Sequence, residues 1–187
     1  RALVTDFDAD AIAELKEIEA ETVHDVKAIE YYLRRRLTDV VGAQRAESLG
    51  ELVHFACTSE DINNTSYALM VQGAVEEVWL PKARALVDQL SAMARDLADV
   101  PLLAHTHGQP ATPTTMGKEL AVLAWRLTRQ LTRVSGTAYL GKLNGATGTY
   151  GAHVVAVPGA DWQQVSRTFV ENLGLTWNPL TTQIESH

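Results

Sequence analysis

Residues 61–97 (DINNTSYALMVQGAVEEVWLPKARALVDQLSAMARDL) carry the apolar spacing of one long α-helix. Apolar side chains recur at intervals of three, four and eight residues: Val71, Val75, Val78, Leu86, Leu90, Met93 and Leu97. Pro81 predicts a kink in this helix without necessarily ending it. At about 1.5 Å per residue, the helix would be roughly 50–60 Å long. A small monomer cannot cover a helix of that length, so the segment predicts an elongated bundle with a partner subunit.

The segments on both sides also have helical spacing. We expect helices over residues 8–21, 24–41, 43–48, 115–139 and 162–173. The apolar residues 53–57 predict an extended segment, and the glycine-rich residues 141–151 predict a flexible one. Strand-like alternation does not extend beyond about five residues anywhere. The sequence therefore predicts an all-α fold, an elongated bundle of long antiparallel helices.

Composition limits the partners and the compartment of this chain of 187 residues. The net charge of −7 argues against nucleic acid, because phosphate binding needs clustered Lys and Arg. Residues 34–36 (RRR) fit the solvated end of a helix. Cys57 is the only cysteine, which excludes an internal disulfide and a metal site built on several thiolates.

Two further observations concern where the chain acts and how complete it is. Apolar runs fall short of the roughly 18 residues of a membrane helix and the chain opens without a secretory signal, so we expect a cytoplasmic protein without membrane contact. The chain begins at Arg1 without an initiator methionine, and we expect it to be an internal part of a longer protein.

Residues 101–119 (PLLAHTHGQPATPTTMGKE) predict a rigid, hydroxyl-rich loop between two helices, and its His105 and His107 indicate a chemical site. A metal pair is disfavoured, because no carboxylate-rich or thiolate partner completes a ligand set. A hydrolase triad of Ser59, His107 and Asp25 is disfavoured, because the sequence has no Gly-x-Ser-x-Gly elbow. The remaining interpretation is acid–base catalysis by His107, with His24 as a second candidate, since histidine titrates near neutral pH.

Three segments with hydroxyl or histidine side chains precede or open predicted helices. Thr58-Ser59 and His24-Asp25 each start a helix, whose free N–H groups and positive dipole end favour an anion. Together with Thr106-His107 they indicate a site for a multiply anionic substrate. Residues 136–142 imitate the spacing of a phosphate loop, but Leu143 offers no hydroxyl to Mg²⁺ and the segment follows a helix rather than a strand.

Longer motifs carry a family resemblance. Residues 58–64 (TSEDINN) and 106–119 (THGQPATPTTMGKE) resemble the first two signature regions of the fumarase/aspartase superfamily. Residues 23–27 (VHDVK) and 178–185 (NPLTTQIE) resemble its members in bacterial purine nucleotide synthesis. The similarity extends through essentially the whole chain. It implies the superfamily's helical fold, incomplete at both ends, with residues 1–57 in an N-terminal helical domain and residues 58–187 in a central helical-bundle domain.

The resemblance implies a lyase that releases fumarate by β-elimination. Its expected substrates are adenylosuccinate, which gives AMP, and succinyl-aminoimidazole-carboxamide ribotide. A base removes a proton from the succinyl Cβ, the carbanion is stabilised as an aci-carboxylate, and an acid protonates the departing nitrogen. Neither a metal nor an organic cofactor is implied. The family further implies a homotetramer in which segments of three subunits form each active site.

Position by position, the resemblance also implies residue roles. His107 is matched to the general acid and His24 to a second active-site histidine. The residues matched to substrate contacts are Val23, Asp25, Thr58, Ser59, Thr106 and Gln183. Some relatives have a polar residue where this chain has Val23, which can offer only its backbone. The sequence leaves open which of the two histidines is the acid.

The family's third signature region, a glycine–serine loop that carries the catalytic base, is not found in the chain, nor is its N-terminal Arg-Tyr phosphate contact. We therefore expect the chain to hold the acid side of the site and to be inactive alone. Two alternatives remain open: another lyase of the superfamily, such as an argininosuccinate lyase or a fumarase, and a helical assembly module without chemistry. The segments VHDVK and TTQIE argue against the first alternative.

Overall fold

The computed structural model describes residues 7–185, which divide into two compact units. The first unit comprises Arg1–Ala68 and Leu140–His187, and the second comprises Leu69–Tyr139. The boundary between them falls inside helix α5 (Ser59–Gly73). The sequence-based domain boundary after residue 57 concerns the complete protein and stays a prediction.

The first unit begins with helices α2 (Ala9–Thr22), α3 (Asp25–Val41) and α4 (Ala43–Gly50). All three lie close to the predicted ranges, because their ends are fixed by local signals. Asp8 caps α2 by accepting a hydrogen bond from the N–H of Ala11 at 2.9 Å. Gly42, with a φ of 79°, separates α3 from α4 in a conformation that favours glycine.

Helices α2 and α3 pack around a small apolar core. Its members are Ala11, Ile18, Ala28 and Tyr32, with Leu15 and Leu33 packed against them. The arginines 34–36 do not lie at a helix end, as the sequence suggested, because α3 continues to Val41. They make ion pairs instead, Arg34 with Glu30 and Glu51, and Arg35 and Arg36 with Glu14. The arginine run therefore ties α3 to its neighbours in the first unit.

The rest of the first unit surrounds the start of α5. Residues 51–56 form consecutive turns, so the predicted extended segment over 53–57 is wrong. Strand β3 (Leu140–Gly141) pairs in parallel with β4 (Thr176–Trp177). Between them lie α8 (Gly151–Ala156) and α9 (Trp162–Asn172). Within the glycine-rich segment that was predicted to be flexible, Lys142, Asn144 and Gly145 are buried.

The second unit contains the remainder of the long helix predicted over 61–97. After α5, the chain forms a π-helical segment, η1 (Ala74–Trp79), and then α6 (Leu80–Asp96). Pro81 lies in the first turn of α6, where a residue without an N–H is tolerated. The wider π-helical turn just before it accommodates the break in the α-helical hydrogen-bond pattern. The structure thus shows a change of helix type before Pro81, and the predicted kink stays a prediction.

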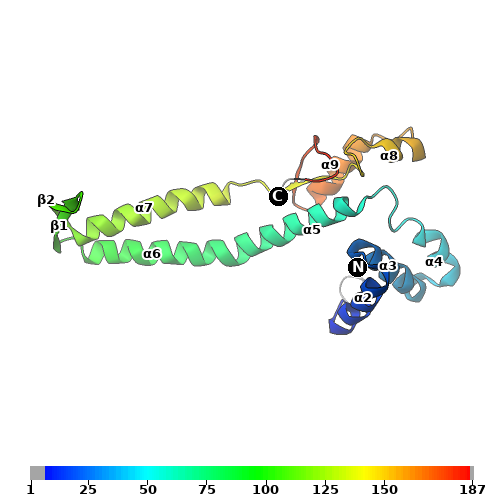
Figure 1. Cartoon of the computed structure of the whole chain (residues 1–187), viewed down its shortest axis with the longest axis horizontal. Coiled ribbons are helices and arrows are strands. Elements are labelled where there is room, and N and C mark those ends of the chain that lie inside the picture. The colour runs from blue at the N-terminus through cyan, green and yellow to red at the C-terminus, as the bar shows by residue number, and fades with distance from the viewer. Residues whose placement is uncertain (1–6, 186–187) are drawn as a thin grey trace. The chain divides into compact units, whose positions relative to one another are not determined.

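Helix α7 (Met116–Ser135) returns antiparallel to α6 (Figure 1). The two helices approach closely at Gly117, where an added Cβ would lie 2.7 Å from the Cα of Ala98. Thr115 caps α7 by accepting a hydrogen bond from the N–H of Lys118 at 3.2 Å. The antiparallel pairing of α6 and α7 agrees with the predicted bundle of long antiparallel helices.

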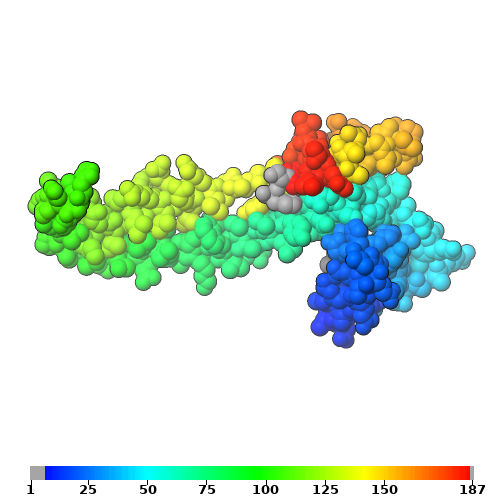
Figure 2. Space-filling view, in the orientation of Figure 1, coloured from blue at the N-terminus to red at the C-terminus, as the bar shows by residue number. Residues whose placement is uncertain are grey.

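A β-hairpin joins α6 to α7. Strand β1 (Pro101–Thr106) pairs antiparallel with β2 (Gln109–Thr115), with an irregularity in register between Leu103 and His105. Figure 2 shows the hairpin, in green, at the end of this helix pair. The predicted loop is therefore a hairpin, and its prolines are tolerated because both strands are edges of a two-stranded sheet.

Across residues 7–185, helices make up most of the regular structure, and the strands are confined to two small two-stranded sheets. Among these residues, no helix combines the length and the apolar character needed to cross a membrane.

Candidate active site

His24 lies at the turn between α2 and α3 and caps α3. Its Nδ1 lies 3.4 Å from the N–H of Lys27 and 3.2 Å from Oδ1 of Asp25, and its Nε2 lies 3.3 Å from Oγ of Ser59. Lys27 and Asp25 are close in sequence, but Ser59 belongs to a different helix, α5. The fold thus brings together two segments that the sequence placed at one site.

The contacts of His24 allow the ring proton to be placed on either nitrogen. When Nδ1 is unprotonated it accepts from the N–H of Lys27, and Nε2–H donates to the hydroxyl of Ser59. When Nδ1 carries a proton it faces the carboxylate of Asp25 instead. The contact with Ser59 is compatible with a proton on either ring nitrogen, because the hydroxyl can accept or donate.

A shallow, open depression lies beside His24. Its lining residues are Lys16, Glu19, Ala20, Val23, His24 and Asp25. Val23 has a left-handed backbone with a φ of 51°, and its residue is 89% exposed. Its N–H donates to the carbonyl of Glu19 at 2.8 Å. The N–H of Val23 is therefore not free for a ligand. The backbone contact expected from the sequence could be made only by the carbonyl of Val23.

Thr58 and Ser59 lie at the start of α5, as predicted. The N–H of Thr58 donates to Oδ2 of Asp61 at 2.9 Å, so this helix start is held by the acidic residue three positions later. The first-turn N–H groups of a helix have no partner within the helix and carry its positive dipole end. This arrangement suits a carboxylate or phosphate group.

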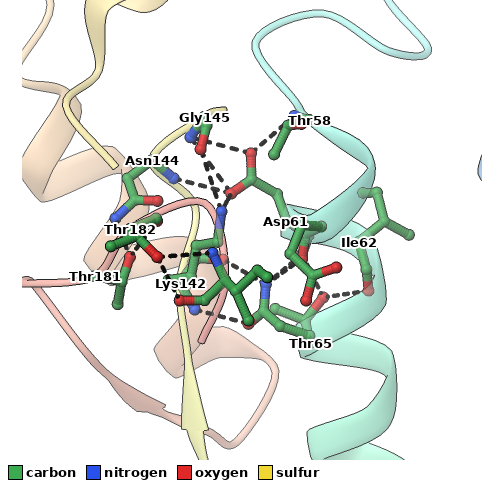
Figure 3. A network of polar contacts seen from close by, with 12 residues as sticks. Thr58, Asp61, Ile62, Thr65, Lys142, Asn144, Gly145, Thr181 and Thr182 are labelled. Carbon is green, nitrogen blue, oxygen red and sulfur yellow. Dashed lines mark hydrogen bonds and ion pairs between the residues drawn. The ribbon is translucent and has the colours of Figure 1, made fainter. Parts of the chain in front are cut away.

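Asp61 belongs to a buried ion pair that sequence reasoning missed (Figure 3). Its Oδ1 lies 2.7 Å from Nζ of Lys142, and both side chains are 0% exposed. The sequence gives one partial indication of this pair, since Lys142 ends the segment 136–142 that has the spacing of a phosphate loop. Its partner could not be read from the sequence, because the pair joins α5 to the segment after β3.

The same cluster reaches the segment that carries Gln183. The N–H groups of Asn144 and Gly145 donate to the carboxylate of Asp61, at 3.1 and 3.2 Å. Nδ2 of Asn144 donates to Oγ1 of Thr181 at 2.7 Å. Gln183, two residues later, is exposed. Gln183 is therefore accessible on the surface of the first unit, as a substrate contact would require.

Cys57 lies next to this cluster and is half-buried. Burial raises the pKa of its thiol to about 11, the carboxylate of Asp61 adds to the rise, and Lys142 opposes it. The thiol therefore stays protonated at neutral pH and is a poor nucleophile.

Thr106 and His107 lie on the β1–β2 hairpin of the second unit. His107 and Gly108 connect the strands in a two-residue turn, with φ values of 52° and 74°. Two positive φ angles are typical of a type I′ turn, which explains glycine at the second position. Oγ1 of Thr106 lies 2.9 Å from Nδ1 of His107 and leaves Nε2 of the exposed ring available to a ligand.

His105 differs from its neighbour. Its Nδ1 lies 3.1 Å from the carbonyl oxygen of Leu103 on its own strand. This local contact agrees with a structural position for His105 rather than a chemical one.

The predicted site residues thus fall into two groups. His24, Asp25, Val23, Thr58, Ser59 and Gln183 belong to the first unit, whereas Thr106 and His107 belong to the second. Within the first unit, His24 and Ser59 are in contact. Within residues 7–185, no group of three or more His, Cys, Asp or Glu side chains is arranged to hold a metal ion.

Comparison with known proteins gives consistent matches over the whole chain. A family model described as "Lyase" matches residues 1–187. The adenylosuccinate lyase of Escherichia coli (strain K12) is 49% identical over 186 residues, and that of Haemophilus influenzae (strain ATCC 51907 / DSM 11121 / KW20 / Rd) is 48% identical over 185. The matches cover 100% and 99% of this chain, respectively, but 40% of each relative. The chain therefore spans about two fifths of the length of these curated relatives.

Among solved structures, the fumarate lyase from Mesorhizobium sp. BNC1 superposes with a TM-score of 0.72 at 22% identity. The match covers 91% of this chain and 37% of the other. At this identity the likeness concerns the fold, and it confirms the predicted all-α class and its fumarase/aspartase-like arrangement.

Proposed function

The chain belongs to the lyase family whose model matches it from residue 1 to residue 187, and we propose that the complete protein is a lyase of purine nucleotide synthesis. It releases fumarate from adenylosuccinate to give AMP, and from succinyl-aminoimidazole-carboxamide ribotide in the same way. The observation that carries this proposal is the 49% identity to an adenylosuccinate lyase along the entire chain. The site geometry supports it, because His24 lies beside the start of α5, whose N–H groups suit an anion.

In this proposal His107 is the general acid that protonates the departing nitrogen. The contact between Nδ1 of His107 and Oγ1 of Thr106 supports the assignment. In the imidazolium form, Nδ1–H donates to the hydroxyl of Thr106, and Nε2–H remains free to give its proton to the leaving group. The position of His107 at the tip of a tight turn presents the ring to a ligand.

The start of α5 holds a carboxylate of the succinyl group. Ser59 offers its hydroxyl, Thr58 its side chain, and the first turn its N–H groups and positive dipole end. These groups stabilise the aci-carboxylate, whose negative charge is greatest in the transition state. His24 lies 3.3 Å from Ser59 and acts on the same end of the substrate, with Asp25 beside it. Val23 and Gln183 complete the substrate contacts.

The proton acceptor lies outside this chain, so the chain alone does not turn over. We further propose that the complete protein is a homotetramer, in which the Thr106–His107 pair and the His24–Ser59 pair reach one substrate from different subunits. Exposed apolar side chains of the second unit support association: Met70, Val71, Val78, Trp79, Leu86, Met93, Leu123 and Trp125. The reaction needs no metal or organic cofactor in this proposal.

Fumarate release by the full-length protein tests the proposal. We expect turnover of adenylosuccinate by the wild-type protein and a kcat lower by about 10²- to 10⁴-fold in His107→Gln, the usual worth of a general acid. His24→Gln should also lower kcat. His105→Gln is the matched control on the same hairpin and should stay near the wild-type rate, because His105 contacts its own strand.

Two results would contradict the proposal. A wild-type protein that releases no fumarate from either substrate would refute the assigned reaction. A His107→Gln variant with wild-type kcat would refute its role as the acid and leave His24 as the candidate.

A further inference from the structure

We propose that Asp61 is a positioning residue, which holds the Thr58–Ser59 helix start and the segment that carries Gln183 in one fixed arrangement. The inference rests on the proposed function, since it concerns the substrate contacts assigned there. It goes beyond them because Asp61 is fully buried and cannot touch the substrate itself.

The carboxylate of Asp61 is shared between its own helix and the segment after β3. Oδ2 accepts from the N–H of Thr58 at 2.9 Å and from the N–H of Gly145 at 3.2 Å. Oδ1 accepts from the N–H of Asn144 at 3.1 Å and lies 2.7 Å from Nζ of Lys142. The side chain of Asp61 thereby links Thr58, the residue next to Ser59, to the glycine-rich segment, whose Asn144 lies 83 residues after Asp61 in sequence.

Charge makes this link difficult to rearrange. Lys142 is buried completely, and Nζ also donates to the carbonyl of Gly145 at 3.2 Å. Removing one partner of such a pair leaves an uncompensated buried charge, which is strongly unfavourable. Asn64, one turn along α5, adds a second bridge, because Oδ1 accepts from the N–H of Lys142 at 3.0 Å. A rearranged cluster would therefore leave a buried charge or a buried N–H group unpaired.

The cluster extends to the third segment through Asn144 and Gly148. Nδ2 of Asn144 donates to Oγ1 of Thr181 at 2.7 Å. Gly148 packs so closely on the carbonyl groups of Thr181 and Thr182 that an added Cβ would clash with both. Thr181 and Thr182 directly precede Gln183 in the chain. Gln183 is therefore connected to Asp61 through the partly buried hydrogen bond of Asn144 to Thr181, and less directly through Gly148, which lies three residues after Gly145.

Oδ1 of Asn144 is a buried acceptor without a partner among the described residues. Asn144 is held by three other contacts: its N–H donates to Asp61, its Nδ2 donates to Thr181, and its backbone carbonyl accepts from the N–H of Tyr150 at 3.1 Å. Loss of the carboxylate at position 61 would leave the N–H of Asn144 without its acceptor, while the contacts of Asn144 to Thr181 and Tyr150 remain.

Full-length Asp61→Asn tests the positioning role, because the amide keeps the shape but replaces an acceptor oxygen with a donor nitrogen. We expect kcat for fumarate release to fall about a hundredfold, the cost of misplacing a contact by about 1 Å. KM should change less, because the affected contacts are strongest in the transition state. The double variant Asp61→Asn/Lys142→Met removes both charges and should show the same loss of kcat without a buried unpaired ammonium.

Ile18→Ala is the matched control. It creates a cavity in the α2–α3 core and lowers the melting temperature, but it touches no member of the Asp61 cluster. Its kcat should stay near the wild-type value. If Ile18→Ala loses as much kcat as Asp61→Asn at a similar melting temperature, or if Asp61→Asn keeps its kcat, the positioning role is refuted.

Hydrogen–deuterium exchange separates this inference from the proposed function. In Asp61→Asn and in the double variant, amide protection should fall together in residues 58–61, 144–148 and 181–183, and it should stay unchanged there in Ile18→Ala. A fall confined to residues 58–61 would refute the coupling. If the wild-type protein releases no fumarate, the proposed reaction fails and the exchange pattern alone decides whether Asp61 connects the three segments.

Discussion

At the scale of single residues, burial decides which side chains of the site region can react. Cys57 lies beside the Asp61–Lys142 ion pair, yet burial and the nearby carboxylate raise the pKa of its thiol to about 11. The ring of His107, by contrast, is exposed at the hairpin turn, where its Nδ1 contacts the hydroxyl of Thr106. The thiol of Cys57 is therefore a poor nucleophile at neutral pH, whereas the ring of His107 is accessible to a ligand.

The thiol of Cys57 should react slowly with an aromatic disulfide reagent at pH 8, because little of it is thiolate. We expect the labelling rate to rise toward pH 11 and to become fast in denaturant at pH 8. Labelling of the folded protein at the rate of the denatured chain would contradict the raised pKa.

The same pKa predicts a loss of stability in alkali. A raised folded-state pKa favours the neutral thiol, so its contribution is fully present below the unfolded pKa of about 8.5 and is lost as the pH rises toward about 11. Urea unfolding between pH 8 and 11 measures this slope, with Cys57→Ala as the control that should lack it. An equal slope in both proteins would assign the loss to other groups.

At the scale of elements, helix ends and close approaches depend on a few atoms. Asp161 caps α9 by accepting from the N–H of Gln164 at 3.0 Å, and Asp8 and Thr115 act in the same way at α2 and α7. Gly117, at the start of α7, packs against the backbone of Ala94, near the end of α6, and of Ala98, just after it. The space between them is too small for a side chain.

Asp161→Ala should lower the free energy of unfolding by about 1 kcal/mol, the usual loss for an N-cap. Asp161→Asn keeps an acceptor oxygen and should lose much less. Chemical denaturation of both variants measures the difference. Equal losses would show that the charge of Asp161, rather than its hydrogen bond to Gln164, stabilises α9.

Gly117→Ala should destabilise the α6–α7 pair by about 1–3 kcal/mol, the range for overpacking. The new Cβ would meet the carbonyl of Ala94 and the backbone of Ala98, which cannot move aside as a flexible side chain could. Gly73→Ala is the control, since a Cβ there meets open space. If both variants unfold at the same denaturant concentration, the close approach at Gly117 is not rigid.

At the scale of the whole molecule, the second unit exposes large apolar groups that its own fold does not bury. Trp125 on α7 is 65% exposed and Leu123, two residues earlier, is 47% exposed. A helix pair with apolar side chains on several faces is typical of a segment that packs against further helices. The proposed tetramer would bury these side chains.

Trp125→Glu in the full-length protein should weaken association, because it places a charge on an apolar surface. Sedimentation velocity should then show smaller species at low micromolar concentration, with a smaller loss in Gln130→Glu, which adds the same charge at an exposed polar position of α7. An unchanged tetramer in Trp125→Glu would place the interface on other residues.

The sequence by itself determined the features that depend on neighbouring residues. Helix α3 begins after His24 and α9 after Asp161, because each cap acts within three residues. The motif residues of the candidate site were predicted in the same way, from short continuous segments. The hairpin at residues 101–115 was missed although its signal is local, because three prolines argue against strands and the His107–Gly108 turn was not recognised.

Only the tertiary structure decided which distant segments meet. The contact of His24 with Ser59 spans 35 residues, and that of Asn144 with Asp61 spans 83. Nothing in the local pattern of Lys142 names its partner, since a buried lysine is stable wherever the fold supplies a carboxylate. The sequence thus specified the helices and the chemical groups of the candidate site. The packing of α5 against the glycine-rich segment produced the buried Asp61–Lys142 cluster. Burial and the pairing of charges are properties of the folded chain, so local sequence patterns do not specify them.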